Sequence, residues 1–303
     1  MKKLLLAFFT IHFFIPVNAQ LPESEVWLFS YTSKNSYIDQ DNGKNISNNP
    51  GYDNQPFFSA DSKSMLWTSQ RDSSQTDIFS YNLSEHVSLR LTQTKVSEYS
   101  PEFIPGSHYF SAVVVEPDST QRLWKYDLSR YDTISKPSEL MFPEIKNIAY
   151  SRWFNTDLIF LCVLPEPMNL ICVNVSTGAP GTAVEKNVGR ALQSYSWKKK
   201  KWLLYTKMNV DSSFSIHSWD IKGNTAFSPV PCLAGSQDFV ADQCGHILMA
   251  KDAKIFSWTI GKSTQWQEVA DLSKNGLHRI TRMAISPNGK NIAFVDNIPL
   301  EKK

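Results

Sequence analysis

The sequence lacks any apolar run long enough to cross a membrane as a helix, which takes ~20 residues. Its most apolar stretch covers residues 4–15, follows two lysines at residues 2–3, and ends in the small residues VNA at 17–19. This order of basic, apolar and small residues is typical of a secretory signal peptide, so we predict one over residues 1–19. Because Gln20 follows instead of Cys, no lipid anchor is expected. The mature chain is therefore predicted to be periplasmic or secreted, with no membrane anchor.

An excess of charge of either sign is also lacking. Removal of the signal peptide takes Lys2 and Lys3 and no acid, which leaves 29 basic and 29 acidic side chains. A nucleic-acid partner needs a net basic surface, so none is expected. Residues 20–303 are rich in aromatic residues, Ser and Thr, and stretches with the 3.6-residue apolar period of a helix do not exceed about ten residues. We therefore predict one large all-β domain.

Cysteine is scarce, and the four present form no CxxC pair and no metal-ligand spacing; they are Cys162, Cys172, Cys232 and Cys244. Cys162 and Cys172 fall on neighbouring predicted strands, where an oxidising compartment would permit a bridge. Buried thiols are the favoured alternative, because a large core accepts cysteine as a small apolar side chain. The sequence leaves the disulfide state open.

Signatures of catalysis are missing as well. The sequence contains no GxSxG elbow, no HExxH, no GxxxxGK[ST] phosphate loop and no EF-hand loop. The five histidines of the mature chain are scattered, at His86, His108, His217, His246 and His278. We therefore expect no catalytic residues, no metal ligands and no cofactor, and favour a non-enzymatic role.

What the sequence does contain is a repeat of an apolar anchor, a polar turn and a second apolar strand. Its clearest copies are FSADSKSMLW at 58–67 and ISPNGKNIAF at 285–294. In the second copy, Asn288 and Gly289 are expected to supply the positive φ angles of a tight hairpin. The six anchors, at intervals of 45, 50, 44, 42 and 46 residues, are Phe58, Phe103, Trp153, Trp197, Phe239 and Ile285. A period of this length is typical of propeller blades, so we predict a six-bladed β-propeller.

A strand with alternating apolar residues follows five of the hairpins, as in Phe79, Tyr81 and Leu83 or in His217, Trp219 and Ile221. No such strand follows the sixth anchor. The missing one is predicted at the front, in Trp27, Phe29 and Tyr31, beside residues 292–295. An N-terminal strand in this place closes the last blade and removes open sheet edges.

These residues resemble the WD40-like (PD40) propeller repeats of the C-terminal domain of TolB. The resemblance is carried by YDNQPFFSADSK at 52–63, TSQRD at 68–72, DIFSYNL at 77–83, RLT at 90–92 and ISPNGK at 285–290. The chain as a whole resembles the exported, single-domain TolB-like propellers of Bacteroidetes-type bacteria, which have no settled biochemical role. The resemblance implies the fold; the N-terminal domain of TolB has no counterpart here, so TolB's envelope role is not implied.

A ligand site is predicted where the segments leading into the innermost strands meet at the mouth of the central channel. These segments carry carboxylates, arginines and tyrosines that suit a peptide end or a sugar, or that form an ordinary wet surface. The candidates are Tyr52, Asp53, Gln55, Glu98, Tyr99, Arg190, Gln237, Asp238, Arg279 and Arg282. The lysines at 198–201 fall on the fourth hairpin, where a solvated loop tip is favoured over a patch for an anionic partner.

Three functions remain after these exclusions. The favoured one is a monomeric, non-enzymatic module in the cell envelope that binds an unidentified protein or peptide. The second is a lyase or lactonase with a divalent metal held by histidine and carboxylate in the channel. The third is glycan binding through surface tryptophans such as Trp266, although most of the nine tryptophans occupy predicted core positions.

Overall fold

A computed structural model describes residues 21–71, 75–129, 134–137, 139–178 and 181–299. The predicted signal peptide, residues 1–19, lies outside the described residues. The described chain is all-β apart from two 3₁₀ turns, η1 (Gln40–Asn42) and η2 (Leu272–Asn275). Within these ranges no helix is long and apolar enough to cross a membrane.

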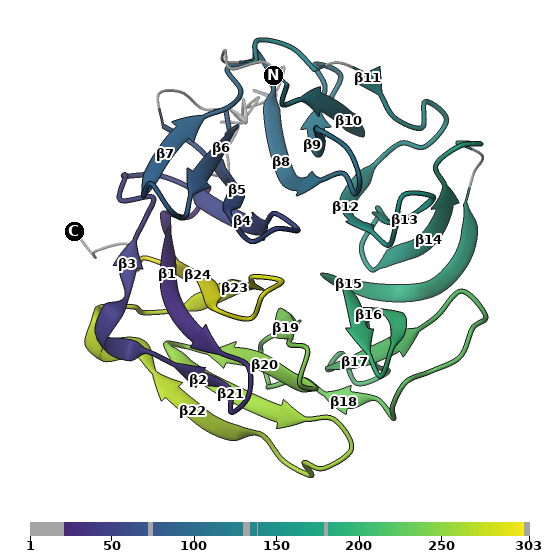
Figure 1. The fold of residues 1–303 in the computed structure, drawn as a ribbon. Coiled ribbons are helices and arrows are strands. Elements are labelled where there is room, and N and C mark those ends of the chain that lie inside the picture. Colours follow the sequence, from purple (N-terminus) through teal and green to yellow (C-terminus); the bar gives the residue numbers. More distant parts are fainter. Residues whose placement is uncertain (1–20, 72–74, 130–133, 138, 179–180, 300–303) are drawn as a thin grey trace, which may run out of the picture.

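The strands of the described residues form five hydrogen-bonded sheets, arranged around a common axis as a β-propeller (Figure 1). Three sheets hold four strands each, ordered along the chain from the centre outward. One contains β4 (Asp53–Phe58), β5 (Ser64–Ser69), β6 (Asp77–Asn82) and β7 (Val87–Arg90). Another contains β8 (Ser97–Phe103), β9 (Tyr109–Val115), β10 (Gln121–Asp127) and β11 (Glu139–Leu140). The third contains β19 (Phe239–Ala241), β20 (His246–Lys251), β21 (Lys254–Thr259) and β22 (Gln267–Asp271).

A seven-stranded sheet is built around the long strand β15 (Thr182–Trp197). The first part of β15 pairs with β14, and its last part, from Leu192 to Trp197, pairs with β16. β15 is thus the last strand of one four-stranded group, which begins at β12, and the first strand of the next group, which ends at β18. The other members are β12 (Ile148–Trp153), β13 (Leu158–Val163), β14 (Met168–Asn174), β16 (Lys200–Met208), β17 (Phe214–Trp219) and β18 (Val230–Pro231).

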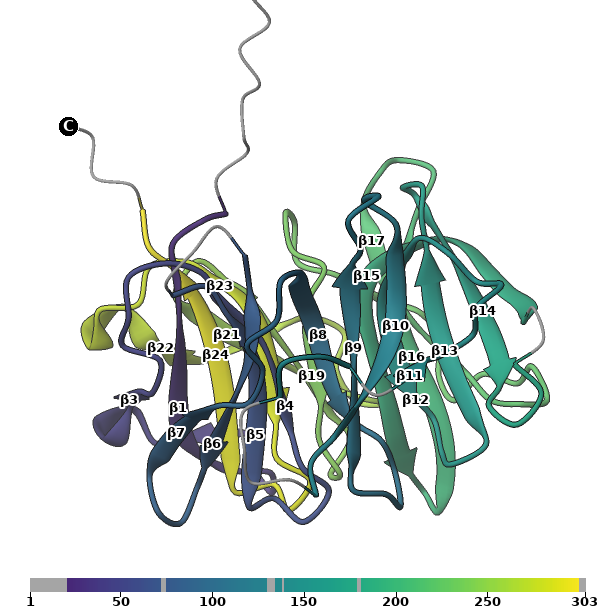
Figure 2. The same cartoon turned by 90° about the horizontal axis from the view of Figure 1, so that it is seen from above.

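The remaining sheet combines segments from the two ends of the chain. β1 (Ser24–Thr32) and β24 (Asn291–Asn297) are antiparallel neighbours, with Trp27 opposite Phe294 and Phe29 opposite Ile292. This is the partner predicted for residues 27–31, and Figure 2 shows the two strands side by side. The other members are β2 (Tyr37–Ile38), β3 (Lys44–Asn45) and β23 (Ile280–Ile285).

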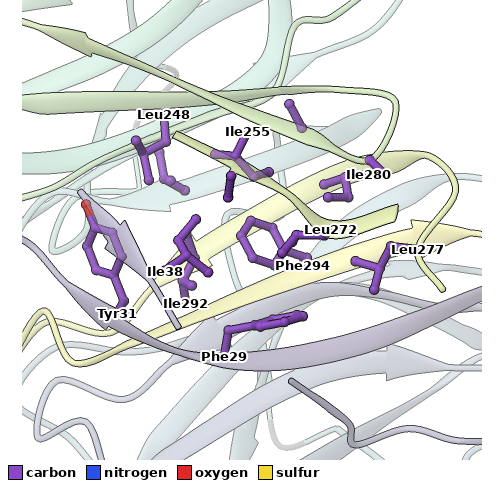
Figure 3. Close-up of a cluster of buried hydrophobic side chains, with 14 residues drawn as sticks. Phe29, Tyr31, Ile38, Leu248, Ile255, Leu272, Leu277, Ile280, Ile292 and Phe294 are labelled. Atoms are coloured by element: carbon purple, nitrogen blue, oxygen red, sulfur yellow. The ribbon is translucent and has the colours of Figure 1, made fainter. Parts of the chain in front are cut away.

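Both faces of β1 are buried between neighbouring sheets. Val26 and Leu28 pack with Trp67 and other side chains of the sheet that starts at β4. On the opposite face, Phe29 packs with Leu248 and other side chains from the sheet that starts at β19 (Figure 3). The alternation of side chains along a strand places these two sets on opposite faces. β1 therefore ties the sheets on either side of it to the core.

The pairing across the hairpins at the ends of the innermost strands shows where the predicted repeat is out of register. Phe58, Phe103, Trp153 and Ile285 pair across their hairpins as predicted, with partners six or seven residues on. The equivalent residues of the fourth and fifth units are Tyr195, opposite Trp202, and Ala241, opposite Ile247. The predicted anchors Trp197 and Phe239 are therefore wrong by two residues. Every second side chain along a strand points to the same face of the sheet. The predicted anchor and the correct one, two residues apart, therefore lie on the same face, and the apolar periodicity does not distinguish between them.

Two smaller expectations also need correction. In the last hairpin only Gly289 has a positive φ, because the loop between Ile285 and Ile292 is longer than a two-residue turn and its first part needs no left-handed residue. Ser62 takes the same left-handed place in the first hairpin. Ile221 is exposed instead of packed, because β17 ends at Trp219 and the chain turns away there.

Candidate functional site

A ring of equivalent residues surrounds the centre of the propeller. Each stands three residues before the corrected anchor of its unit, and all six line one inner cavity of about 80 Å³. The members of this central ring are Gln55, Ser100, Tyr150, Leu192, Asp238 and Arg282. Each lies on or beside one of the innermost strands, β4, β8, β12, β15, β19 and β23 (Figure 1).

β-bulges explain why these side chains line the cavity. The pairing register shifts at this level in five innermost strands, for example between Asn54 and Phe57 and between Tyr99 and Glu102. A bulge places two residues opposite one and re-aims the side chains beside it. Gln55 and Ser100 also have positive φ angles within their bulges.

The channel opens at both ends of the innermost strands into wider cavities. The entry-side cavity, of about 500 Å³, is lined by residues from the beginnings of these strands. The hairpin-side cavity, of about 530 Å³, is lined by residues from their ends and from the hairpins. Both are within the size range of ligand pockets.

The entry-side cavity brings together six of the ten predicted site residues, Tyr52, Gln55, Tyr99, Arg190, Arg279 and Arg282. It also contains Tyr150, which the sequence prediction missed. The signal that would have found Tyr150 is its place three residues before Trp153, which matches Gln55 before Phe58. Three tyrosines and three arginines thus share one cavity.

Asp238 holds two of these arginines. Its Oδ2 accepts a hydrogen bond from Arg190 Nε at 2.7 Å and another from Arg190 Nη2, while Arg282 Nη1 lies 3.6 Å from Oδ1. Arg282 also donates to the Tyr150 hydroxyl at 3.2 Å. Burial favours a lower pKa for Arg282, but Asp238 and the tyrosines outweigh burial and raise the pKa. The Arg282 guanidinium therefore stays charged, and Asp238 holds both guanidinium groups in position.

Tyr52 stays protonated in this setting. Burial raises its pKa to about 12, although the nearby Arg282 and Arg190 charges favour the phenolate. Its ring packs edge-to-face on Tyr99, with centroids 6.4 Å apart. The cavity therefore offers the neutral phenol of Tyr52 beside fixed cations.

The other four predicted site residues stand outside the lining of the entry-side cavity. Asp53 is fully buried within its own sheet and accepts a hydrogen bond from Trp67 Nε1 at 2.9 Å. Glu98, also fully buried, accepts from Thr94 Oγ1 at 2.7 Å and from the Tyr126 hydroxyl at 3.0 Å. The carboxyl groups of Asp53 and Glu98 therefore accept hydrogen bonds from buried side chains inside the propeller and do not line the cavity. Gln237 has a supporting place, because its Oε1 accepts from the backbone N–H of Arg190 at 3.1 Å. The tenth residue, Asp238, belongs to the central ring.

The histidines do not converge on the channel. His246 Nδ1 lies 3.0 Å from Asp242 Oδ2, and His278 Nδ1 lies 3.1 Å from Asp296 Oδ2; each pair lies within its own sheet. Among the described residues, no three His, Cys, Asp or Glu side chains are arranged to hold a metal ion. The residues described here thus offer no metal site for the lyase or lactonase hypothesis.

The expectation of four buried thiols is only partly right, because Cys162 is buried, Cys172 and Cys232 are half-buried, and Cys244 is exposed. All four cysteines are free thiols; Cys162 and Cys172 lie on adjacent strands, but each faces a different residue, Leu170 and Phe160. The Trp266 ring lies tilted against Trp258, with centroids 5.6 Å apart, and its Nε1 donates to the Pro231 carbonyl at 2.8 Å. That contact accounts for Trp266 without a glycan.

No family model matches the sequence, and no curated protein matches it. Solved structures do. One described as a putative TolB from Agrobacterium tumefaciens has a TM-score of 0.63 at 12% identity, covering 92% of this chain and 100% of that chain. TolB from Acinetobacter baumannii has a TM-score of 0.54 at 10% identity, covering 90% of this chain and 64% of that chain. At such identities the similarity shows the fold alone, and this chain has the β-propeller fold of TolB proteins.

Proposed function

We propose that the chain forms a ring of six four-stranded blades, closed by its N-terminal strand. The split pairing of β15 supports the count, since its two parts make two blades of the seven-stranded sheet. The strand order β23, β24, β1, β2 supports the closure. The first two strands come from the C-terminal part of the chain, and β1, from the N-terminal part, is the third strand of the same blade. In this proposal residues 20–303 are one domain, exported after loss of residues 1–19 and monomeric in the periplasm or outside the cell.

We propose that this propeller is a non-enzymatic interaction module whose entry-side cavity binds a protein or peptide. One observation carries the proposal: Tyr52, Tyr99 and Tyr150 stand beside three arginines in one cavity. Tyr and Arg are the residues that most often dominate binding energy at protein interfaces. Fixed cations favour a segment of the partner that carries carboxylates.

A charge reversal at Arg279 tests this proposal. Arg279 is exposed, lines the cavity and has no ion pair among the described residues. With Arg279→Glu, retention of the partner from an envelope extract is expected to fall about tenfold or more, because a like charge at an interface costs several kcal/mol. Quantitative pull-down with the mature protein measures this effect.

The matched control is Lys274→Glu, which makes the same charge change at an exposed residue of η2, outside this cavity. It is expected to retain the partner as the unmodified protein does. Equal retention by Arg279→Glu would contradict the proposal. A stoichiometric metal in the purified protein, with no partner retained, would instead favour the metal-dependent lyase or lactonase.

A further inference from the structure

The hairpin-side cavity is separate from the entry-side cavity and lies at the opposite end of the channel. Its walls come from the last residues of β4, β15, β19 and β23 and from the hairpins that follow three of them. Apolar side chains contribute to these walls, among them Phe57, Leu192, Phe239 and Met283. The cavity therefore has the volume that a small organic ligand needs, and part of its wall is apolar.

Positive charge dominates this cavity. Its lining includes Arg152, Lys198 and Lys199, and the single acidic residue of the lining is Asp242. The Asp242 carboxylate is fully committed, since it accepts from the Tyr31 hydroxyl at 2.7 Å, from His246 and from backbone N–H groups of its own turn. No ion pair joins Lys198 or Lys199 to an acid among the described residues.

The excess of positive charge remains when the carboxylate beside Arg152 is included. Glu102 Oε1 lies 3.8 Å from Arg152 Nε and partly neutralises that guanidinium. The two lysines still leave the cavity positive. A net positive concavity with apolar walls concentrates anions.

Two buried polar groups on the walls have no hydrogen-bond partner among the described residues. They are Arg152 Nε and the Tyr195 hydroxyl. Buried polar groups in folded proteins are nearly always paired, so each such exception calls for an explanation. Both groups are hydrogen-bond donors, and both residues belong to the lining of the cavity.

The lysines occupy a turn whose geometry disfavours them. Trp197 pairs with Lys200, so Lys198 and Lys199 form a two-residue hairpin turn, with φ angles of 50° and 62°. Such turns strongly favour Asn-Gly, because side chains other than Gly and Asn disfavour positive φ. Lys198 Nζ also stands 4.2 Å from the centroid of the Trp197 ring, a cation–π contact. The cation–π contact stabilises Lys198 in this turn, whereas the Lys199 side chain has no hydrogen bond, ion pair or ring contact among the described residues.

We propose that the hairpin-side cavity is a second binding site, which takes an organic anion: a carboxylate or phosphate carried on an apolar body. The anionic group is bound by Lys198, Lys199 and Arg152, with the Tyr195 hydroxyl as a further donor. The apolar body lies against Phe57, Leu192, Phe239 and Met283. This site is independent of the protein or peptide proposed for the entry side.

Calorimetric titration of the mature protein tests the site with three probes of one shape: 2-naphthoate, 2-naphthyl phosphate and the neutral 2-naphthamide. At least one of the two anions is expected to bind about tenfold more tightly than the amide, the gain typical of a charge-assisted hydrogen bond. Which anion binds more tightly distinguishes a carboxylate ligand from a phosphate ligand. Equal binding of all three probes, or no binding, would overturn the proposal.

The double substitution Lys198→Asn with Lys199→Gly separates binding from folding. It installs the preferred turn residues, so the melting temperature is expected to stay the same or rise, while the affinity for the anion falls about tenfold or more. The charge-matched control replaces two exposed lysines outside the cavity, Lys262→Gln and Lys274→Gln, and is expected to leave the affinity unchanged. Unchanged affinity in the hairpin variant, or an equal loss in the control, would show that the cavity is not the site.

Discussion

Deletion of residues 20–31 is expected to leave no monomer with a cooperative melting transition. β1 pairs with β24 at seven consecutive positions and buries Val26, Leu28, Phe29 and Tyr31. Each of these side chains contributes roughly 1.5–3 kcal/mol through burial, so their combined loss is comparable with the ~5–15 kcal/mol that stabilises a whole domain. The deletion also leaves β24 as an open edge, which favours association between chains. Size-exclusion chromatography and thermal melting of the truncated protein measure both effects.

Point variants within β1 refine this prediction. Phe29→Ala is expected to lower the free energy of unfolding by about 3–5 kcal/mol, because it leaves a cavity in the cluster around Phe294 and Leu248. Ser30→Ala, one residue on but exposed, is expected to change it by less than about 0.5 kcal/mol. A truncated protein that stays monomeric with unchanged melting would show that β1 is not needed for the fold.

The fold was largely predictable because the repeat acts through periodicity and spacing. Apolar residues every second position mark strands, and polar turns at similar intervals mark hairpins, so even the partner of Trp27 and Phe29 could be predicted. The same periodicity explains the errors at Trp197 and Phe239. A shift of two residues restores the same face, and only the hairpin pairing, seen as Tyr195 opposite Trp202, fixes the register.

The candidate site was less predictable because it depends on bulges. In a regular strand, alternation would tell which of two successive residues faces the channel. The bulge after Asn54 breaks that alternation, and the structure places Gln55 in the cavity but Asp53 inside the sheet. A sequence pattern does not reveal a bulge of this kind when its residues are ordinary. Tyr150 also lies at a register shift, between Ile148 and Tyr150, so alternation alone does not place it in the cavity, although its spacing from Trp153 does.

The protein is expected to be less stable at pH 8 than at pH 5. Burial raises the pKa of Asp53 to about 6 and the pKa of Glu98 and Glu102 to about 7. The folded state therefore binds protons that the unfolded state has already released between about pH 4.5 and pH 7. Stability is greatest at the acid end of this window and is lost as the pH rises through it. Each group contributes at most about 3 kcal/mol, and urea unfolding at both pH values measures the total.

Other groups limit this gain on the acid side. Hydrogen bonds to Asp61, Asp211 and Asp271 lower the pKa of each carboxyl group, so their contribution is lost as the pH falls below about 4. Burial lowers the pKa of His217, which opposes the gain from the buried acids below about pH 6.5. Three buried carboxyls outweigh one half-buried imidazole, so the maximum of stability is expected near pH 5.

Glu98→Gln isolates one of the buried acids. The amide keeps the shape of the neutral carboxyl among Thr92, Thr94 and Tyr126, but it has no charge to desolvate at high pH. The variant is expected to be more stable than the unmodified protein at pH 8 and to lose less stability between pH 5 and pH 8. Glu144→Gln, at an exposed position, is expected to leave the pH dependence unchanged. An unmodified protein whose free energy of unfolding rises with pH across this window would show that Asp53, Glu98 and Glu102 are ionised in the fold, and that the hydrogen bonds around them outweigh their burial.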